Sequence, residues 1–457
     1  MSAPPAPVPG SSPVAPRLGV VGTGYVGLVT AAALAELGHD VVCLDIDEAK
    51  VELLRGGGVP FSEPGLPEVL ARNHDRFTFT TDPHELFSNE AGVSSIVFVT
   101  VDTPPSASGD ADLSRVEAVI EAIPDDVAPL TLVMKSTVPV NTGSRVQRRL
   151  RARGLRQVSY AANPEFLREG SALSDVFHPD RVVVGADDPE VAAAVASLWE
   201  PLGGELLIAD LASAEMIKLA SNAFLATKIS FVNEIANVCD VVGADVTVVA
   251  HGMGLDRRIG PAFLNAGLGY GGSCFPKDVT ALKQLAGNSG YHFQLLSSVI
   301  EVNELQKRRV ITTLAARLGH LVGARVALLG LAFKPDTDDM REASSVVLAE
   351  RLVAEGVLVV THDPVVGDVS GRLPAEVVRA DTLEAALDGV DAAIIVTEWP
   401  EYRRLIDPAI VALMGRPLVI DGRNLLDPAT ASDAGIEWVG VGRPMVAGTD
   451  SAVGAAP

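Results

Sequence analysis

One short segment of the chain, residues 267–278, reads GLGYGGSCFPKD and surrounds a cysteine with glycines. A cysteine with a purely structural role usually sits among bulky apolar neighbours. Cys274 instead stands where glycines let the backbone approach a ligand closely, and Lys277 and Asp278 follow it. A thiolate becomes a strong nucleophile when nearby cations or hydrogen-bond donors stabilise it. The pattern therefore favours covalent chemistry at Cys274 over an ordinary glycine-rich loop.

Two polar residues stand out in the apolar segment MIKLASNAF (216–224). Lys218 and Asn222 are four residues apart, so they share one face of a helix. Both side chains donate hydrogen bonds, and together they could stabilise a developing oxyanion. A solvated helix face would carry the same two residues, and the helix alone does not choose between these interpretations.

Two further motifs follow expected strands. NPEFLREG (163–170) contains Glu165 and Glu169, which we interpret as a carboxylate pair on a short helix. KSTVP (135–139) places Thr137 at the end of another strand. Because ligands of such sheets lie outside the carboxyl ends of the strands, both motifs should face the same crevice. Taken singly, each motif is also typical of a loop and a helix cap.

The chain opens its globular part with a dinucleotide-binding pattern. The segment GTGYVG fits GxGxxG, follows the buried strand LGVV and begins an apolar helix; its residues include Gly22, Gly24, Tyr25, Val26 and Gly27. The glycines allow a tight turn, close approach of backbone to a pyrophosphate, and close packing of helix on strand. The next strand ends at Asp45, whose carboxylate would bind a ribose diol and repel a 2′-phosphate. NAD is therefore favoured over NADP, with FAD as an alternative.

Apolar runs and helical segments alternate over the first 210 residues, as in LGVV, DVVCLD, SSIVFVTV, LTLVMKST, QVSYAA and RVVVGA. This alternation predicts a parallel, doubly wound sheet. From residue 211 Phe224, Phe231 and Val238 recur at helical spacing, so we expect one long helix with Ser213 as its N-cap and Glu215 in its first turn. At about residue 324 strands and helices alternate again, in RVALLG, VLVVTHDP, DAAIIVTEW and PLVIDGRN.

The predicted fold is thus α/β, with two Rossmann-like doubly wound domains joined by a long central helix and a helical domain. The expected segments are a disordered tail (1–16), an NAD-binding domain (17–210), a central helical domain (211–323), a sugar-nucleotide-binding α/β domain (324–443) and a second disordered tail (444–457). The tails are rich in Pro, Ala and Ser or Gly, and the first lacks the basic start and apolar core of a signal peptide.

Composition excludes several classes of function. A formal net charge of −22 argues against nucleic acid or an anionic membrane as a partner. The three cysteines lie far apart without metal-ligand spacing, and the histidines form no ligand cluster, so we expect no metal site. So few cysteines fit a reducing cytoplasm. Any phosphate-bearing ligand must be held by backbone amides and a few selected basic side chains.

Seven motifs in order now carry a resemblance: GTGYVGLVTA, KSTVP, NPEFLREG, EMIKLASNAF, GYGGSCFPKD, GLAFKPDTDDMREA and DGRN. Together they closely resemble the UDP-glucose/GDP-mannose dehydrogenase family, over about residues 17–443. The resemblance implies an NAD-dependent, two-step oxidation of a sugar-nucleotide primary alcohol to a carboxylate. It also implies a thiohemiacetal and then a thioester on Cys274, because an aldehyde gives up a second hydride only after a nucleophile has added to it.

The resemblance assigns roles to individual residues. The catalytic positions are Cys274 as nucleophile, Lys218 and Asn222 around the oxyanion and bound water, and Asp278, Glu165 and Thr137 for protons or water. The cofactor positions are Gly22, Gly24, Tyr25, Val26, Gly27, Asp45, Lys50, Thr103, Thr137, Glu169, Lys277 and Arg341. The substrate positions are Glu165, Phe166, Leu167, Arg168, Lys218, Asn222, Arg258, Phe263, Leu264, Gly269, Tyr270, Gly271, Cys274, Phe333, Lys334 and Arg423.

UDP-glucose is the expected substrate. By resemblance, Phe275 in FPKD favours it over GDP-mannose, whose enzymes often carry Leu at that position. Alternatives are GDP-mannose oxidation, a non-catalytic NAD-binding relative, and a 2-hydroxyacid or 6-phosphogluconate-type dehydrogenase. The NAD-binding relative and the last type of dehydrogenase would not need the cysteine. The long central helix is apolar on more than one face, which predicts a homodimer or a larger homo-oligomer. Arg258 matches a position that reaches across a dimer interface in the family.

Overall fold

The computed structural model describes residues 17–87, 95–106, 109–367 and 369–444. The chain divides into two compact units, Met1–Asn222 with Thr280–His292, and Ala223–Val279 with Phe293–Pro457. The predicted disordered tails lie outside the described residues apart from Pro444.

The first unit is built on an eight-stranded sheet, counted over its described residues, in the order β3-β2-β1-β4-β5-β6-β7-β8. The strands are β1 (Leu18–Val21), β2 (Val41–Leu44), β3 (Phe77–Thr80), β4 (Ile96–Val99), β5 (Leu130–Met134), β6 (Val158–Ala162), β7 (Arg181–Gly185) and β8 (Glu205–Ala209). Strands β1 to β6 are parallel, as predicted, but β7 meets β6 antiparallel, with Ala162 opposite Gly185, and β8 follows β7. The sequence missed this reversal because a buried strand has the same apolar run in either direction.

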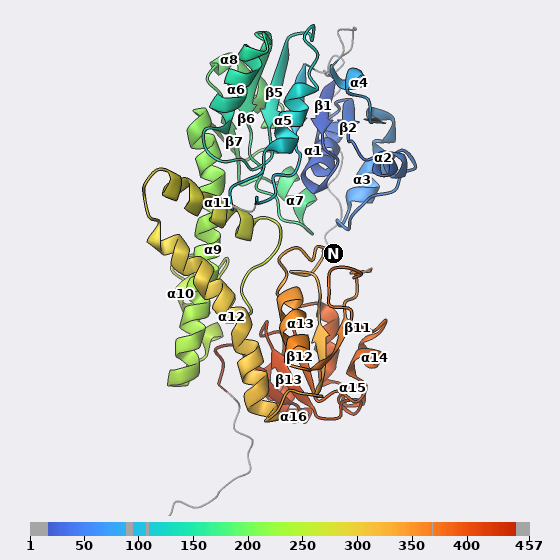
Figure 1. Ribbon diagram of the computed structural model, residues 1–457, viewed down its shortest axis with the longest axis vertical. Helices are drawn as coiled ribbons and strands as arrows, with labels where there is room; N and C mark the ends of the chain where they lie inside the picture. Colours follow the sequence, from blue (N-terminus) through green and yellow to red (C-terminus); the bar gives the residue numbers. More distant parts are fainter. Residues whose placement is uncertain (1–16, 88–94, 107–108, 368, 445–457) are drawn as a thin grey trace, which may run out of the picture. The chain divides into compact units, whose positions relative to one another are not determined.

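Helices cover this sheet, and Figure 1 shows them coloured blue to green. They are α1 (Tyr25–Glu36), α2 (Glu48–Arg55), α3 (Leu66–Arg72), α4 (Pro83–Phe87), α5 (Ser114–Glu121), α6 (Thr142–Ala152), α7 (Ala172–Phe177) and α8 (Pro189–Ser197), with short 3₁₀ turns at His74–Arg76 and Glu200–Leu202. Val41 and Cys43 of β2 join one apolar cluster, and Val42 and Leu44 join another. Successive side chains of a strand point to opposite faces, so the sheet has a core on each side.

The long central helix, α9 (Leu211–Val242), begins in the first unit and continues in the second. Its start differs from the prediction. Asp210 accepts hydrogen bonds from the backbone N–H of Ser213 (2.9 Å) and from its hydroxyl (2.7 Å). Ser213 is therefore not the N-cap but lies inside the first turn, capped by Asp210, because Asp at this position satisfies a free helix N–H equally well. The helical region continues with α10 (Val246–Gly254), α11 (Phe275–Asn288) and α12 (Gln294–Leu318).

The second unit contains a six-stranded parallel sheet over its described residues, in the order β11-β10-β9-β12-β13-β14. Its strands are β9 (Arg325–Leu329), β10 (Leu358–His362), β11 (Val378–Arg379), β12 (Ala392–Ile395), β13 (Leu418–Asp421) and β14 (Glu437–Gly440). Its helices are α13 (Ser344–Ala354), α14 (Leu383–Leu387), α15 (Pro408–Val411) and α16 (Pro428–Asp433), with a 3₁₀ helix at Pro400–Ile406. The order repeats that of β3-β2-β1-β4-β5-β6, so the prediction of a second Rossmann-like domain is confirmed.

The glycine motif before α1 yields a test of the packing. A Cβ on Gly27 would lie 1.9 Å from the carbonyl oxygen of Gly22 and 2.6 Å from Oγ1 of Thr100. We expect Gly27→Ala to lower the free energy of unfolding by about 2 kcal/mol or more, because backbone must move to admit the methyl group. Thermal unfolding measures the loss. A Cβ on Gly24 meets nothing within 4 Å, so Gly24→Ala is the control, and equal melting temperatures for the two variants would contradict the prediction.

Candidate active site

The first half of the site is the glycine turn at the carboxyl end of β1. Gly22 has φ +93°, a left-handed conformation that favours glycine, and Gly24 is the residue that caps α1. A Cβ on Gly24 would have no atom within 4 Å, and among the described residues no side chain caps this helix. The N-terminus of α1, which carries partial positive charge, therefore has open space beside Gly24. This cradle fits the pyrophosphate of a dinucleotide.

Asp45 lies at the end of β2, beside that cradle. It is buried, and it accepts hydrogen bonds from the N–H (2.8 Å) and hydroxyl (2.7 Å) of Thr23, the N–H of Asp47 and Nζ of Lys50 (3.0 Å). Burial alone would raise the pKa of this carboxyl, but these donors together hold its pKa below the ordinary value. Asp45 is thus an anion at the position where a ribose would bind. Lys50, another predicted cofactor residue, lies directly against it.

Glu165 and Lys218 form a buried ion pair, with Nζ 2.8 Å from Oε1. Glu165 also accepts a hydrogen bond from the N–H of Leu167. Burial would raise the pKa of Glu165, but Lys218 outweighs it and the pKa is lowered. The expected carboxylate pair on a short helix is wrong, because residues 163–168 form an extended loop and the partner of Glu165 is a lysine from α9.

Two cations near this pair were missed by the sequence analysis. The guanidinium of Arg181, on β7, lies 3.8 Å from the centroid of the Phe166 ring, and Nζ of Lys218 lies 5.4 Å from it. Lys135 is buried and donates to Oδ1 of Asn163 (3.1 Å). Burial lowers the pKa of Lys135 to about 8, although Glu165 acts to raise it. The lysine of KSTVP, placed at the end of a buried strand, was the signal that could have found this residue.

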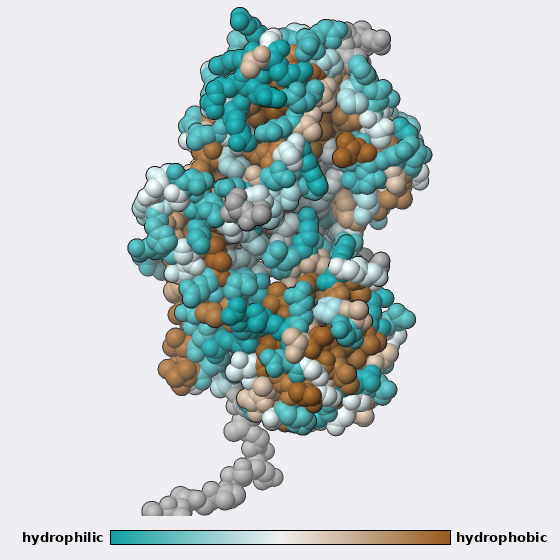
Figure 2. Space-filling model, in the orientation of Figure 1, coloured by the Kyte–Doolittle hydropathy of each residue, from teal (hydrophilic) through white to brown (hydrophobic). Residues whose placement is uncertain are grey.

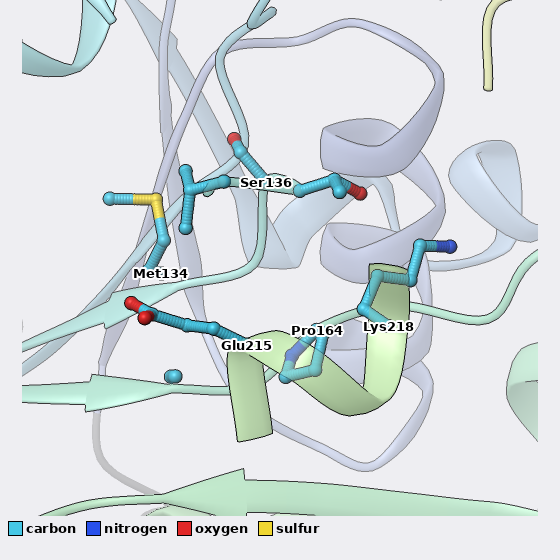
Figure 3. Close-up of a pocket in the computed structure, with 8 residues that line it drawn as sticks. Met134, Ser136, Pro164, Glu215 and Lys218 are labelled. Atoms are coloured by element: carbon cyan, nitrogen blue, oxygen red, sulfur yellow. The ribbon is translucent and has the colours of Figure 1, made fainter. Parts of the chain in front are cut away.

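A small cavity of about 10 Å³ lies between these elements and has room for one water molecule. Its lining residues are Met134, Ser136, Thr137, Val138, Ala162, Pro164, Glu215 and Lys218. In Figure 3 the side chains of Glu215 and Lys218 leave α9 in different directions. Glu215 accepts the backbone N–H groups of Asn141 and Gly143, each at 2.7 Å, and so fixes the start of α6 to α9. Burial raises the pKa of Glu215 to about 7.

Thr137 and Thr103 meet at the edge of the same sheet. The hydroxyl of Thr103 donates to the carbonyl oxygen of Thr137 at 2.7 Å, and Thr103 is buried. Asn222 is also buried, one turn beyond Lys218 on α9. The first unit therefore contains a set of predicted catalytic and cofactor residues that the fold brings to the carboxyl ends of β1, β2, β4, β5 and β6.

Cys274 belongs to the second unit and immediately precedes α11. Its carbonyl oxygen accepts the N–H of Asp278 at 2.9 Å, so the thiol stands at the start of a helix, where partial positive charge stabilises an anion. The thiol is partly exposed, and the hydroxyl of Ser273 lies 3.6 Å from Sγ. Asp278 is almost fully buried and pairs with Nζ of Lys277 at 2.5 Å.

Several of the residues expected to bind a sugar nucleotide lie around the cysteine segment within the same unit. The ring of Phe333 would lie 2.8 Å from a Cβ on Gly272, whose N–H donates to the carbonyl oxygen of Arg341. A Cβ on Gly271 would lie 2.3 Å from the carbonyl oxygen of Glu342. Arg423 donates to the carbonyl oxygen of Gly269 at 3.3 Å. Lys334 lies beside Phe333, with Nζ 5.5 Å from the ring centroid.

Three predicted arginines have carboxylate partners of their own. Arg168 bonds Asp175, Arg258 bonds Asp256, and Arg341 bonds Asp339. Their side chains are exposed, so each guanidinium is available to solvent while a neighbouring acid holds its orientation. Of the other positions, Leu167 packs against the first core, Leu264 is buried in the helical region, and Phe263 has φ +64°. Such a φ is rare for a bulky residue and marks backbone strain.

Three sequence models match in order: the UDP-glucose/GDP-mannose dehydrogenase family NAD binding domain over residues 16–203, its central domain over 212–305, and its UDP binding domain over 327–428. The chain belongs to the UDP-glucose/GDP-mannose dehydrogenase family. It is therefore an oxidoreductase with that family's NAD-binding domain, as the resemblance implied.

Relatives and solved structures agree with the family assignment. UDP-glucose 6-dehydrogenase YwqF of Bacillus subtilis is 46% identical over 93% of this chain and 98% of its own length. UDP-glucose 6-dehydrogenase of Pseudomonas aeruginosa is 44% identical over 94% and 98%. A UDP-glucose dehydrogenase structure from Pyrobaculum islandicum has a TM-score of 0.85 and 38% identity, covering 95% of this chain and 99% of its own.

The described residues contain no cluster of three or more side chains able to hold a metal ion. Among the helices that the structure describes, none is both long and apolar enough to cross a membrane.

The buried ion pair yields a prediction with a defined pH dependence. Lys218→Met should destabilise the protein by about 3 kcal/mol at neutral pH, because it leaves Glu165 buried without its main cation. In the wild type the lowered pKa means that the carboxylate stabilises the fold above pH 4.5 and that this is lost as pH falls. In the variant burial favours the protonated acid, so the deficit should grow from pH 4.5 to 7.5. Melting temperatures across that range measure it.

The control is Glu165→Gln combined with Lys218→Met, which removes both charges and should abolish this pH dependence. A deficit of the same size at pH 4.5 and 7.5 in Lys218→Met would contradict the assignment.

Proposed function

We propose that this chain oxidises UDP-glucose to UDP-glucuronate, with two molecules of NAD used in turn. The observation that carries the proposal is the placement of Cys274 at a helix start, in a loop packed on the residues of the UDP-binding domain. Lys218, Asn222 and Glu165 supply the second group of functional side chains. A binding protein without catalysis would need neither a partly exposed thiol nor a buried lysine.

In the proposed first oxidation, the C6 hydroxyl of the sugar loses its proton to water and C6 loses a hydride. NAD, when bound, accepts the hydride at each oxidation. Lys218 stabilises the negative charge that develops on the C6 oxygen, and Asn222 donates a hydrogen bond to the same oxygen. Glu165 orients Lys218, since its Oε1 lies 2.8 Å from Nζ of the lysine. Thr137, in the cavity beside Lys218, positions water.

The second oxidation needs the cysteine. The thiolate of Cys274 adds to the C6 aldehyde, forming a C–S bond, and the carbonyl oxygen becomes the thiohemiacetal oxygen. Loss of a second hydride from C6 gives a thioester. Water then attacks that carbon, the C–S bond breaks, and the products are a carboxylate and the regenerated thiol. Asp278, buried four residues after Cys274, handles the proton of the attacking water.

Several contacts support the choice of substrate and cofactor. Phe333, Lys334 and Arg423 provide an aromatic ring and two cations near the cysteine loop, which suits a uracil base and a diphosphate. The UDP-glucose enzymes compared are 38–46% identical, whereas a GDP-mannose dehydrogenase structure from Pseudomonas aeruginosa has 27% identity and a TM-score of 0.51. The ionised Asp45 disfavours the 2′-phosphate of NADP.

Counting NADH tests the proposal. With UDP-glucose we expect two NADH per sugar consumed, because alcohol to acid is a four-electron oxidation. With GDP-mannose we expect no turnover. Cys274→Ser should lose net turnover, because serine is a poorer nucleophile here and its oxygen ester hydrolyses slowly. A yield of one NADH per sugar would refute the thioester route. Turnover with GDP-mannose alone would refute UDP-glucose as the substrate. Full activity in Cys274→Ser would refute the nucleophile.

We also propose a homodimer built on α9. Phe224, Phe231 and Val238 are exposed and seven residues apart, so they form one stripe on the helix. Figure 2 shows apolar residues, in brown, over the lower end of α9. A seven-residue apolar repeat matches the same stripe on a second copy of the helix. In the dimer, the apolar stripe of one α9 would therefore pack against the apolar stripe of the other.

Molar mass in solution tests the dimer. Phe231→Glu should shift the mass measured by light scattering from dimer to monomer, because two carboxylates would be buried against apolar side chains. Val322→Glu, which changes an exposed apolar residue outside α9, is the control. An unchanged mass for Phe231→Glu, or a monomeric wild type, would contradict this interface.

A further inference from the structure

The glycine-rich segment before Cys274 is held by side chains from the surrounding helices. Oδ1 of Asn233, on α9, accepts the N–H of Gly267 at 2.8 Å. Asn303, on α12, makes two bonds to one residue: its Oδ1 accepts the N–H of Tyr270 at 2.8 Å and its Nδ2 donates to the carbonyl oxygen of Tyr270 at 3.1 Å. Asn303 is only 3% exposed. Because water cannot replace these bonds, the amide fixes both the position and the direction of the Tyr270 peptide groups.

Gly269 makes this contact possible. It has φ +89°, and a Cβ there would lie 2.5 Å from Oδ1 of Asn303. Any side chain would push the amide away from Tyr270. Gly269 is thus needed for the contact between Asn303 and Tyr270, as well as for close approach of a ligand.

Aromatic contacts connect Tyr270 to Phe275, the residue that follows Cys274. The rings of Tyr270 and Phe275 are 5.9 Å apart and nearly perpendicular, at 87°. Phe263, the residue with φ +64°, contacts Phe275 from another segment at 6.0 Å. Phe275 is the first residue of α11 and is bonded to Cys274. Edge-to-face pairs of this kind restrict both rings.

We propose that Asn303 is a positioning residue for the Cys274 nucleophile, acting through Tyr270 and Phe275. This inference rests on the proposed function, because it assumes that Cys274 adds to the aldehyde. Addition of a thiolate to a carbonyl requires close and directed approach, and a displacement of about 1 Å can cost about a hundredfold in rate. The first oxidation does not use the thiol. Loosening the anchor should therefore slow the second oxidation selectively.

The test uses the full-length enzyme and the ratio of the two oxidations. Asn303→Ala should lower kcat at least about tenfold, and NADH formed per UDP-glucose consumed should fall from two toward one, with aldehyde trapped by hydroxylamine. A structural defect that only reduces the folded fraction would lower both oxidations equally and leave the ratio at two. Asn237→Ala is the matched control, because that amide on α9 bonds Glu234 and Gln306 and not the loop.

Asn303→Asp keeps the acceptor for the Tyr270 N–H and loses the donor, so we expect a ratio between those of wild type and Asn303→Ala. It decides the question if the alanine variant does not fold. A ratio of two for a folded Asn303 variant, with kcat like that of Asn237→Ala, would overturn the positioning role. A wild type that yields one NADH per sugar would instead overturn the proposed function.

Discussion

Burial of a lysine and a glutamate in contact is the constraint on which the first unit depends. Each charge loses its hydration when Lys218 and Glu165 leave water, and their contact offsets part of that loss. Their contact requires the loop after β6 and the start of α9 to lie side by side. Glu215, which bonds the backbone N–H groups at the start of α6, attaches the same end of α9 to the first unit.

Carboxylates at strand ends recur as loop anchors in both sheets. Asp45 follows β2, Asp363 follows β10 and Asp421 ends β13, and all three are buried. Asp363 accepts the N–H of Leu331 and Asp421 that of Leu426, and each also accepts an indole N–H. Burial raises the pKa of Asp421, against its hydrogen bonds. The acidic side chains of this chain thus accept hydrogen bonds from backbone N–H groups. The loops held by Asp363 and Asp421 carry Lys334 and Arg423.

The sequence predicted most strands and the glycine turn correctly, because each of these features depends on the residues of one short segment. Apolar runs gave the strands, and the glycine spacing gave the turn after β1, whose close packing at Gly27 follows from the missing side chain. The functional motifs also fell at the expected strand ends. Two failures depended on neighbours distant in the chain: the direction of β7 and the partner of Glu165. The third, the cap of α9, was a choice between two local candidates, Asp210 and Ser213.

By itself, then, the sequence determined the two α/β domains, the central helix, the family and the residues able to do chemistry, because periodicity and motif spacing are properties of short segments. Tertiary structure alone decided which polar and charged side chains meet their partners. Arg181 over Phe166, Lys135 near Glu165, and Asn303 on Tyr270 join segments 15 to 33 residues apart. No local pattern encodes such contacts, because they arise only when packing excludes water and each buried polar group must find a partner.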